Sequence, residues 1–378
     1  MKFMHLSDLH LGKRISEFSL IEDQTYILDR IIEITDDEKP DAVLIAGDIY
    51  DKPVPSAEAV RLFDDFLCRL SDRKLQAFVI SGNHDSSERI AFGARLMNSS
   101  GIHMSPVYEG RVEPVRLKDE WGDVYVYMLP YIKPATARRF FPDEKIESYN
   151  DAVRVCVKNI DIDDNSRNII VAHQFVTGAL RSDSEDVSVG GSDNVDISIF
   201  DAFDYVALGH IHRPQNAGSA KARYCGTPLK YSFSECSHSK SVTIAELIPG
   251  KEPQVRIEEL VPLHDMREIK GKYMELTDRS CYEGTAVDDY LHITLTDEEE
   301  IPDAIGKLRA VYPNIMKLDY DNKRTRSNST VDAAEAVESR SPMELFEELY
   351  QLQNNSAMSD EQRNFCLEII KQIWEDER

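Results

Sequence analysis

Clusters of acidic, amide and imidazole side chains follow five apolar, strand-like runs of this chain, and this arrangement restricts the fold more than any other feature. Apolar runs such as residues 42–46 are typical of strands buried in a parallel sheet. A polar group directly after such a strand lies at the carboxyl edge of the sheet, where open α/β folds hold their ligands. We therefore expect one shared site for the following clusters: Asp8-Leu9-His10, Gly47-Asp48, Gly82-Asn83-His84-Asp85, His173 and Gly209-His210-Ile211-His212.

Strand-like runs alternate with helical patterns over the first two thirds of the chain. Strands near 3–6, 42–46 and 77–80 are separated by two segments in which apolar residues recur at helical spacing. Ser56 stands where a cap of the second helix is expected. Further strands are expected near 124–129, 168–172, 205–208, 241–247 and 254–260, with a helix over 149–160. Residues 1–265 are thus predicted to be an α/β domain, a layered sheet sandwich flanked by helices.

The remaining third predicts different structures. Residues 266–320 predict a small α+β module with strands near 268–277, 290–295 and 314–320 and a helix over 302–311. It has none of the ligand-type clusters, so we expect it to cover or shape the site. Residues 321–340 are charged and poor in apolar side chains, as is typical of a linker.

Residues 341–378 predict two short amphipathic helices. Each begins with a capping-box pattern, Ser341-Pro342-Met343-Glu344 and Ser359-Asp360-Glu361-Gln362. Such a pair can fold back on the body or dock on a partner. We favour a partner, because apolar side chains, including Trp374, line one face of these helices.

Composition limits the classes of function. Of the 378 residues, 68 are acidic and 44 are basic, for a net charge of −24. This balance argues against a surface coated with basic DNA-binding side chains, so positive charge for nucleic acid would come from metal ions, local patches or a partner.

Targeting and cysteine signals are few. No apolar run approaches the roughly 18 residues of a membrane span, so we expect no membrane association. The N-terminal residues lack the apolar region of a signal peptide and predict the cytoplasm. Six cysteines without CxxC spacing are expected to be free thiols rather than a zinc site.

The strand-end clusters contain seven candidate metal ligands without a thiolate: Asp8, His10, Asp48, Asn83, His173, His210 and His212. This oxygen and nitrogen set suits divalent ions such as manganese, iron or zinc, whereas magnesium alone would favour oxygen. Seven donors exceed what one ion usually takes from side chains, so we expect two ions that share Asp48. Two such ions about 3.5–4 Å apart can clamp a phosphate and activate a bridging water, which is the chemistry of phosphoester hydrolysis.

His84 is the predicted catalytic residue. It follows Asn83 directly and is therefore not expected to share the ion of Asn83. A histidine beside the ions can hydrogen-bond the phosphate or protonate the leaving group. Asp85 could orient this histidine or support the site from behind.

Several other features are predicted to be ordinary. Alone, Asp8-Leu9-His10 could cap a helix and Gly82-Asn83-His84-Asp85 could be a turn. Residues 178–195 are predicted to be a mobile loop beside the site, and Gly190-Gly191 within it is predicted to be a plain turn rather than a phosphate cradle. The isolated histidines are predicted to be polar loop residues: His5, His103, His238, His264 and His292.

Together, the five motifs resemble the calcineurin-like metallophosphoesterases. A closer resemblance, carried by residues 5–12, 46–51, 81–86, 207–212 and 224–233, is to the bacterial members that process DNA double-strand breaks. Where archaeal and eukaryotic relatives carry a second histidine, this chain has Asp51, which we place outside the catalytic set. The resemblance implies one ion on Asp8, His10, Asp48 and His212 and a second ion on Asp48, Asn83, His173 and His210.

The resemblance also implies an activity and partners. It implies a manganese-dependent 3′→5′ exonuclease on double-stranded DNA, with endonuclease activity on single strands, gated by ATP turnover in a coiled-coil ATPase. Residues 266–320 would cap the site, and residues 341–378 would bind the base of the coiled coil. A homodimer within a heterotetramer would form through helices near 55–70 and 87–98.

Two alternatives remain from the residues alone. One is a phosphodiesterase or phosphatase that acts on small molecules or phosphoproteins, which the ligand set does not exclude. A capping module and a docking tail would then have no evident use. The other is a scaffold without catalysis, which would have no chemical reason to keep seven ligands and His84.

Overall fold

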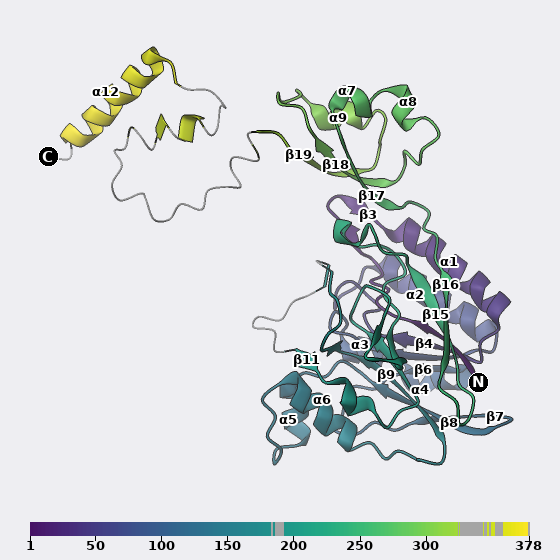
Figure 1. The fold of residues 1–378 in the computed structure, drawn as a ribbon. Helices are drawn as coiled ribbons and strands as arrows, with labels where there is room; N and C mark the ends of the chain where they lie inside the picture. Colours follow the sequence, from purple (N-terminus) through teal and green to yellow (C-terminus); the bar gives the residue numbers. More distant parts are fainter. Residues whose placement is uncertain are drawn as a thin grey trace. The chain divides into compact units, whose positions relative to one another are not determined.

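The computed structural model describes residues 1–378 except 183, 186–192, 324, 326–342, 344, 345, 348, 352–357, 377 and 378. The chain separates into two compact units, Met1–Met266 (unit 1) and Arg267–Arg378 (unit 2). Figure 1 labels many of the helices and strands of each unit. None of the described helices is both long and apolar enough to cross a membrane. The six cysteines are free thiols, as predicted.

Unit 1 contains two six-stranded sheets (Figure 1). The first has the order β16-β15-β1-β4-β5-β6, and its last four strands are parallel: β1 (Lys2–Leu6), β4 (Ala42–Ala46), β5 (Gln76–Ile80) and β6 (Ile102–Met104). Two antiparallel strands complete it: β15 (Ser241–Glu246) and β16 (Gln254–Glu259).

The second sheet has the order β13-β14-β12-β9-β8-β7. Its four central strands are parallel: β14 (Ser219–Tyr224), β12 (Tyr205–Gly209), β9 (Arg167–His173) and β8 (Gly122–Leu129). The edge strands are antiparallel: β13 (Gln215–Ala217) and β7 (Val115–Asp119).

Alternating side chains of the second sheet build two layers of core. Ile169, Val171 and Ala207 pack in one cluster with Phe3 and Phe78 of the first sheet. The intervening residues, such as Ile170 and Leu208, pack in another cluster with helix α6 (Tyr149–Lys158) and helix α5 (Pro134–Phe140). This division follows from the two-residue period of a strand, which sends successive side chains to opposite faces.

Helices α1 (Ile21–Glu38) and α2 (Ala57–Asp72) pack against the first sheet. The Thr35 hydroxyl of α1 lies 3.5 Å from Met4 Sδ of β1, and Ile27, Leu28, Ile31 and Ile32 are buried. Ser56 caps α2 as predicted, with its hydroxyl 3.2 Å from the Ala59 N–H. Unit 1 is therefore the predicted α/β sandwich of two sheets flanked by helices.

Short elements complete unit 1. They are β2 (Arg14–Ile15), β3 (Phe18–Ser19), β10 (Phe175–Val176), β11 (Asn194–Val195) and three 3-10 turns, η1 (Asn98–Ser100), η2 (Ile197–Phe200) and η3 (Phe233–Glu235). The helical structure expected near 87–98 is present but divided. Two short helices, α3 (Ser87–Ile90) and α4 (Ala94–Met97), stand there, because Gly93 between them has a φ of 75°.

Unit 2 contains a three-stranded sheet of order β17-β18-β19, made of β17 (Met266–Gly271), β18 (Tyr290–Leu295) and β19 (Ile315–Tyr320). Its core includes Leu291, Ile293 and Leu308. The strand predicted over 268–277 is too long: β17 ends at Gly271, and α7 (Tyr273–Leu276) follows. The helix predicted over 302–311 is shorter, α9 (Ala304–Leu308), and α8 (Arg279–Tyr282) was not predicted.

The C-terminal predictions are described in part. The second helix, α12, spans Asp360–Asp376. Ser359 and Gln362 form the predicted capping box, with the Ser359 N–H 2.9 Å from Gln362 Oε1 and the Gln362 N–H 3.3 Å from Ser359 Oγ. Most of the linker predicted over 321–340, the capping residues 341, 342 and 344, and the side chain of Trp374 lie outside the described residues.

Candidate metal centre

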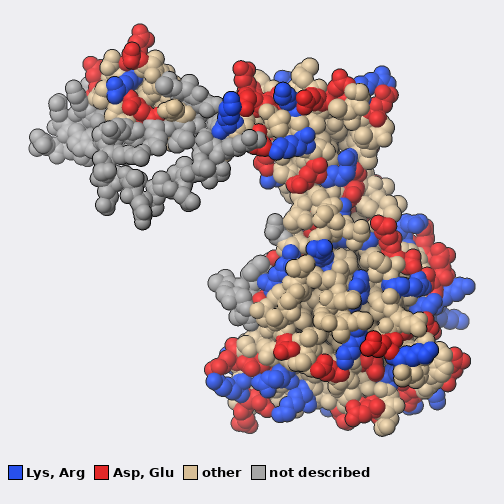
Figure 2. Space-filling view, in the orientation of Figure 1, with Lys and Arg blue, Asp and Glu red and all other residues tan. Residues whose placement is uncertain are grey.

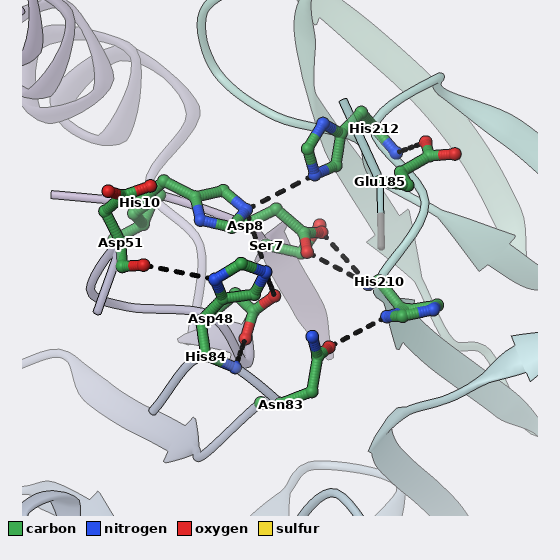
Figure 3. Close-up of polar contacts among 12 residues, drawn as sticks. Ser7, Asp8, His10, Asp48, Asp51, Asn83, His84, Glu185, His210 and His212 are labelled. Carbon is green, nitrogen blue, oxygen red and sulfur yellow. Dashed lines mark hydrogen bonds and ion pairs between the residues drawn. The ribbon is translucent and has the colours of Figure 1, made fainter. Parts of the chain in front are cut away.

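The five strand-end clusters meet at one edge of unit 1, and Figure 3 labels residues of four of them; His173, the fifth, contacts Asp48 and Asn83. Strands β1, β4 and β5 of the first sheet and β9 and β12 of the second deliver these clusters. Pairing of Gly209 with His173 and of Ala46 with Ile80 keeps neighbouring strand ends level. The predicted ligands Asp8, His10, Asp48, His173, His210 and His212 are buried, and Asn83 is half-buried. The parallel sheets thus bring together all seven predicted ligands.

Four of these residues have unusual backbone. The φ angles are 53° at Asp8, 44° at His10, 49° at Asp48 and 99° at His210, in the region that L-residues rarely adopt. Hydrogen bonds of 3.0 Å from Asp8 N to Gly47 O and from His10 N to Asp48 O hold these turns. Strained backbone of this kind is held in place only by its surroundings and is concentrated at functional sites.

Two glycines allow the close approach of these loops. A Cβ on Gly82 would lie 2.1 Å from Asp48 Oδ1, and a Cβ on Gly209 would lie 1.9 Å from the Ala46 carbonyl oxygen. Both distances are far below van der Waals contact, so any side chain at either position would displace the loop or the carboxylate.

One group of donors lies around His10. Single donor atoms of Asp8, His10 and His212 all lie within 4.8 Å of one another. His10 Nε2 is 3.3 Å from His212 Nε2 and 3.8 Å from Asp48 Oδ2. The Asp8 carboxylate also accepts the His210 N–H at 3.0 Å, which ties the first sheet to the second.

A second group lies around His173. Its Nε2 is 3.3 Å from Asp48 Oδ2 and 2.9 Å from Asn83 Oδ1. The same Asn83 oxygen is 2.9 Å from His210 Nδ1. Asp48 Oδ2 therefore lies near donors of both groups, as expected for a carboxylate that two ions could share.

His84 lies at the exposed side of the site. Its backbone N–H donates to Asp48 Oδ1 at 2.9 Å, and its ring packs edge-on against His10 at 4.8 Å. Its side chain is 22% exposed, against 3% for Asp48. His84 Nε2 is 4.0 Å from Asp48 Oδ2, and His10, Asp48 and His84 also fit a metal-sized group.

The orienting partner of His84 is the Asp51 backbone. His84 Nδ1 donates to the Asp51 carbonyl at 3.1 Å, and the Asp51 carboxylate pairs with Lys13 at 2.7 Å. Asp85 does not orient His84 but supports the site from behind, the second of the two roles expected for it. Its carboxylate accepts backbone N–H groups of Gly82, Ile49 and Tyr50 at 2.9–3.0 Å and so joins two loops of the site.

Hydrogen bonds set which ring nitrogen can bind a metal. His173 Nδ1–H donates to the Ala46 carbonyl at 2.8 Å, so its Nε2 carries the lone pair. On His212, Nδ1 lies 2.7 Å from Ser184 Oγ and 3.3 Å from Glu235 Oε1, which leaves Nε2 to face His10. Both tautomers are those of a metal ligand.

Burial shapes the protonation of the site. Burial lowers the pKa of His10 and of His210 well below the usual value, so both rings are neutral, as ligands must be. Burial alone would also lower the pKa of His173, but the Asp48 carboxylate raises it to about 9. Lone pairs of Asp48, Asn83 and His173 point toward one another. A proton or a metal ion between these three side chains is needed to offset their repulsion. The donor set therefore fits two divalent ions.

Sequence reasoning missed four supporting residues. Glu185 Oε1 accepts the His212 N–H at 2.6 Å, and Ser184 contacts the His212 ring. Buried Glu235 and Lys240 form an ion pair behind His212, with 2.5 Å between Nζ and Oε2. Ser184 and Glu185 lie within residues 178–195, which the sequence predicted to be a loop beside the site, although it did not single them out. No pattern in the sequence pointed to Glu235, which ends η3, or to Lys240, which precedes β15. Residues 186–192, which include Gly190 and Gly191, lie outside the described residues.

The prediction that the isolated histidines are loop residues is wrong for three of them, because His5 lies in β1, His103 in β6 and His292 in β18. His5 Nδ1 is 3.1 Å from the Tyr205 hydroxyl, and His103 stacks on Phe78 at 4.7 Å. His264 pairs with Asp23 at 3.0 Å. Among the residues that the structure describes, the metal-sized groups contain none of these histidines.

Two family models match the chain. Residues 1–214, more than half of the chain, match the calcineurin-like phosphoesterases. Residues 262–354 match the SbcD_C family, described as the type 5 capsule protein repressor C-terminal domain.

Solved structures with a similar arrangement share little sequence with this chain. A dimetal phosphatase from Danio rerio is 12% identical over 69% of this chain and 96% of its own, with a TM-score of 0.42. The protein TT1561 of Thermus thermophilus is 11% identical over 69% and 99%, with a TM-score of 0.40. The phosphoesterase Yfce from E. coli is 13% identical over 65% and 88%, with a TM-score of 0.27. The long match of residues 1–214, which spans all seven predicted ligands and His84, is the decisive finding. The chain belongs to the calcineurin-like phosphoesterase family.

Proposed function

We propose that this chain is the SbcD-type nuclease subunit of a DNA repair complex, a metal-dependent enzyme that hydrolyses phosphodiester bonds of DNA. The observation that carries the proposal is the convergence of seven oxygen and nitrogen donors around a shared Asp48, with His84 at the exposed side. The proposed activities are those of a 3′→5′ exonuclease on double strands and an endonuclease on single strands.

Two divalent ions, which we propose to be Mn²⁺, would be held by the two donor groups. Asp8, His10, Asp48 and His212 would hold one ion, and Asp48, Asn83, His173 and His210 would hold the other. When bound, such ions would polarise the phosphate and activate a water for attack on it.

His84 is the proposed catalytic residue of the chain itself. Its Nδ1–H donates to the Asp51 carbonyl at 3.1 Å, which fixes the ring and leaves Nε2 toward the site. From this position it can donate a hydrogen bond to a phosphate oxygen or a proton to the leaving oxygen. The exposed position of His84 supports this role, because a substrate would reach it from solvent.

The match of residues 262–354 to the SbcD_C family supports a DNA substrate and an SbcC-type coiled-coil ATPase as partner. Residues 266–320 would form the capping domain, residues 321–340 a linker and residues 341–378 the docking helices. Apolar side chains of the last segment are exposed, among them Phe346, Leu349, Phe365 and Ile369. An exposed apolar helix face is a common docking surface for a partner helix.

The charge of the chain suits this division of labour. On the face drawn in Figure 2, basic side chains are interspersed with acidic ones over unit 1. We propose that the ATPase subunit supplies the basic DNA track while this chain supplies the cutting site. A homodimer would pair through the region of α2, α3 and α4, where Phe92 and Leu96 are 84% and 81% exposed.

The proposal is tested with end-labelled double-stranded DNA and Mn²⁺, with and without the ATPase partner and ATP. We expect stepwise removal of nucleotides from 3′ ends, faster with partner and ATP, and none after chelation of the metal. Hydrolysis of a small phosphodiester without cleavage of DNA under any of these conditions would instead establish a small-molecule phosphodiesterase.

A truncated chain ending at residue 340 tests the docking segment. We expect it to lose binding to the ATPase while its own Mn²⁺-dependent hydrolysis stays at the full-length level. Binding that survives the truncation would place the docking surface elsewhere on the chain.

A further inference from the structure

Resting on the proposed two-ion site, we propose that Glu235 and Lys240 are positioning residues: they hold His212 in its metal-binding tautomer and make the ion on the His212 side the more tightly bound of the two. Neither residue lies at a strand end or belongs to the seven predicted ligands.

Glu235 lies directly behind the His212 ring. It is fully buried, and its Oε1 is 3.3 Å from His212 Nδ1. The Ser184 hydroxyl lies between them, 2.7 Å from Nδ1, and donates to the same carboxylate oxygen. The acceptors behind Nδ1 keep the proton on that nitrogen, so the lone pair of Nε2 remains available to bind a metal ion.

Lys240 fixes the carboxylate and the backbone of the ligand. It is 4% exposed, and its ammonium reaches three acceptors: Glu235 Oε2 at 2.5 Å, Thr227 Oγ1 at 2.7 Å and the His212 carbonyl at 2.9 Å. These acceptors use all three donors of the lysine. Its role is therefore internal, and it joins the carboxylate behind the ring to the main chain that carries the ring.

His173 and His212, one from each donor group, differ in what stands behind their rings. His173 Nδ1–H donates to a neutral peptide carbonyl, that of Ala46, at 2.8 Å. His212 Nδ1 is backed by the Ser184 hydroxyl at 2.7 Å, which donates to Glu235, and by the Glu235 carboxylate itself at 3.3 Å. A carboxylate raises the basicity of a ligating imidazole more than a neutral carbonyl does, and such supporting groups typically change metal affinity by about 10- to 100-fold. The ion on the His212 side should therefore bind more tightly.

The test replaces the ion pair by apolar side chains of similar size in the full-length chain, Glu235→Leu with Lys240→Met, so that no buried charge is left without its partner. Nitrogen-15 NMR of the histidine rings in metal-free protein reports the tautomer. We expect His212 to change from the Nδ1–H form to a mixture. Glu235→Gln with Lys240→Met keeps an acceptor behind the ring without leaving a buried charge, and should restore the Nδ1–H form.

Calorimetric titration with Mn²⁺ reports the two binding steps. We expect the tighter step to weaken about 10- to 100-fold in the double variant while the other step is unchanged. Asn83→Ala identifies the steps, because it removes a donor of the other group only. Equal weakening of both steps would overturn the assignment to the His212 side, and an unchanged tautomer with unchanged titration would overturn the proposal.

Asp119→Asn is the matched control. Asp119 is half-buried and forms an ion pair with Arg167, 2.5 Å apart, at the opposite end of the strand that ends in His173. This variant should lower stability without altering the His212 tautomer or either Mn²⁺ step. Neither readout involves DNA, so failure of the nuclease proposal and failure of this one are distinguishable.

Discussion

The strand-end site of unit 1 and the sheet of unit 2 use the same residue types in different ways. In unit 1, donor atoms of Asp8, His10 and His212 converge within 4.8 Å. In unit 2, the two nitrogens of His292 face opposite carboxylates on neighbouring strands, 2.9 Å to Glu268 and 2.8 Å to Asp319. Convergence of lone pairs, rather than the presence of histidine and carboxylate, distinguishes a candidate metal site.

Burial and backbone make the same distinction. Six of the seven unit 1 donors are buried, and four of the seven stand on backbone with positive φ, whereas the carboxylates beside His292 are 57% and 46% exposed. Exposed ion pairs are screened by water and contribute little to stability, with a median of about 0–1 kcal/mol. Buried donors without a cation are costly, which is why the unit 1 group requires metal ions or protons.

The largest expected effect comes from Asp48→Ala. Because Asp48 lies between both donor groups, its loss should abolish binding of both ions together and with it all metal-dependent hydrolysis. Elemental analysis of the purified variant, alongside a phosphodiesterase assay, measures both effects. Retention of one full ion per chain would show that Asp48 is not shared.

His84→Ala separates catalysis from metal binding. Loss of a proton donor to the leaving group should lower the rate of hydrolysis by about 10²- to 10⁴-fold. The metal content should stay at the wild-type value, measured by the same elemental analysis. A matching loss of metal would make His84 a ligand, a role that its distance of 4.0 Å from Asp48 Oδ2 also allows.

Gly82→Ala tests the close packing of the site. The added methyl group would lie 2.1 Å from Asp48 Oδ1 and must displace it. We expect a loss of about 1–3 kcal/mol in the free energy of unfolding, together with weaker Mn²⁺ binding. Gly122→Ala is the control for the metal readout. No atom lies within 4 Å of its added Cβ, but the φ of 117° at this position makes the substitution strained, so it should lower stability and leave Mn²⁺ binding intact.

The smallest effect is expected in unit 2. His292→Gln removes an imidazole that lies beside two carboxylates. It is therefore the unit 2 counterpart of replacing a histidine ligand in unit 1. It should change the free energy of unfolding by less than about 1 kcal/mol and leave metal content unchanged, as chemical denaturation and elemental analysis would show. A loss of bound metal in this variant would contradict the distinction between convergent and paired donors.

Local sequence patterns were sufficient for the main elements. The two-residue and 3.6-residue periods of apolar side chains predicted strands such as β4 and helices such as α2, because burial of one face dominates the stability of each element. The polar clusters after the strands predicted which residues gather at the sheet edge, because parallel strands end together. The break between α3 and α4 and the early end of β17 were missed. At those places a single turn interrupts the element, and the periodic pattern of apolar residues is too weak to mark it.

Tertiary structure alone decided how the gathered residues are supported. Nothing near Glu235 or Lys240 in the sequence indicates a contact with His212, because packing of a distant loop creates that contact. The tautomer of His173 depends likewise on the carbonyl of Ala46, 127 positions away in the chain. The sequence by itself determined the donor types and the order in which strands present them. Their distances, protonation and supporting partners follow from long-range packing, which no local pattern encodes.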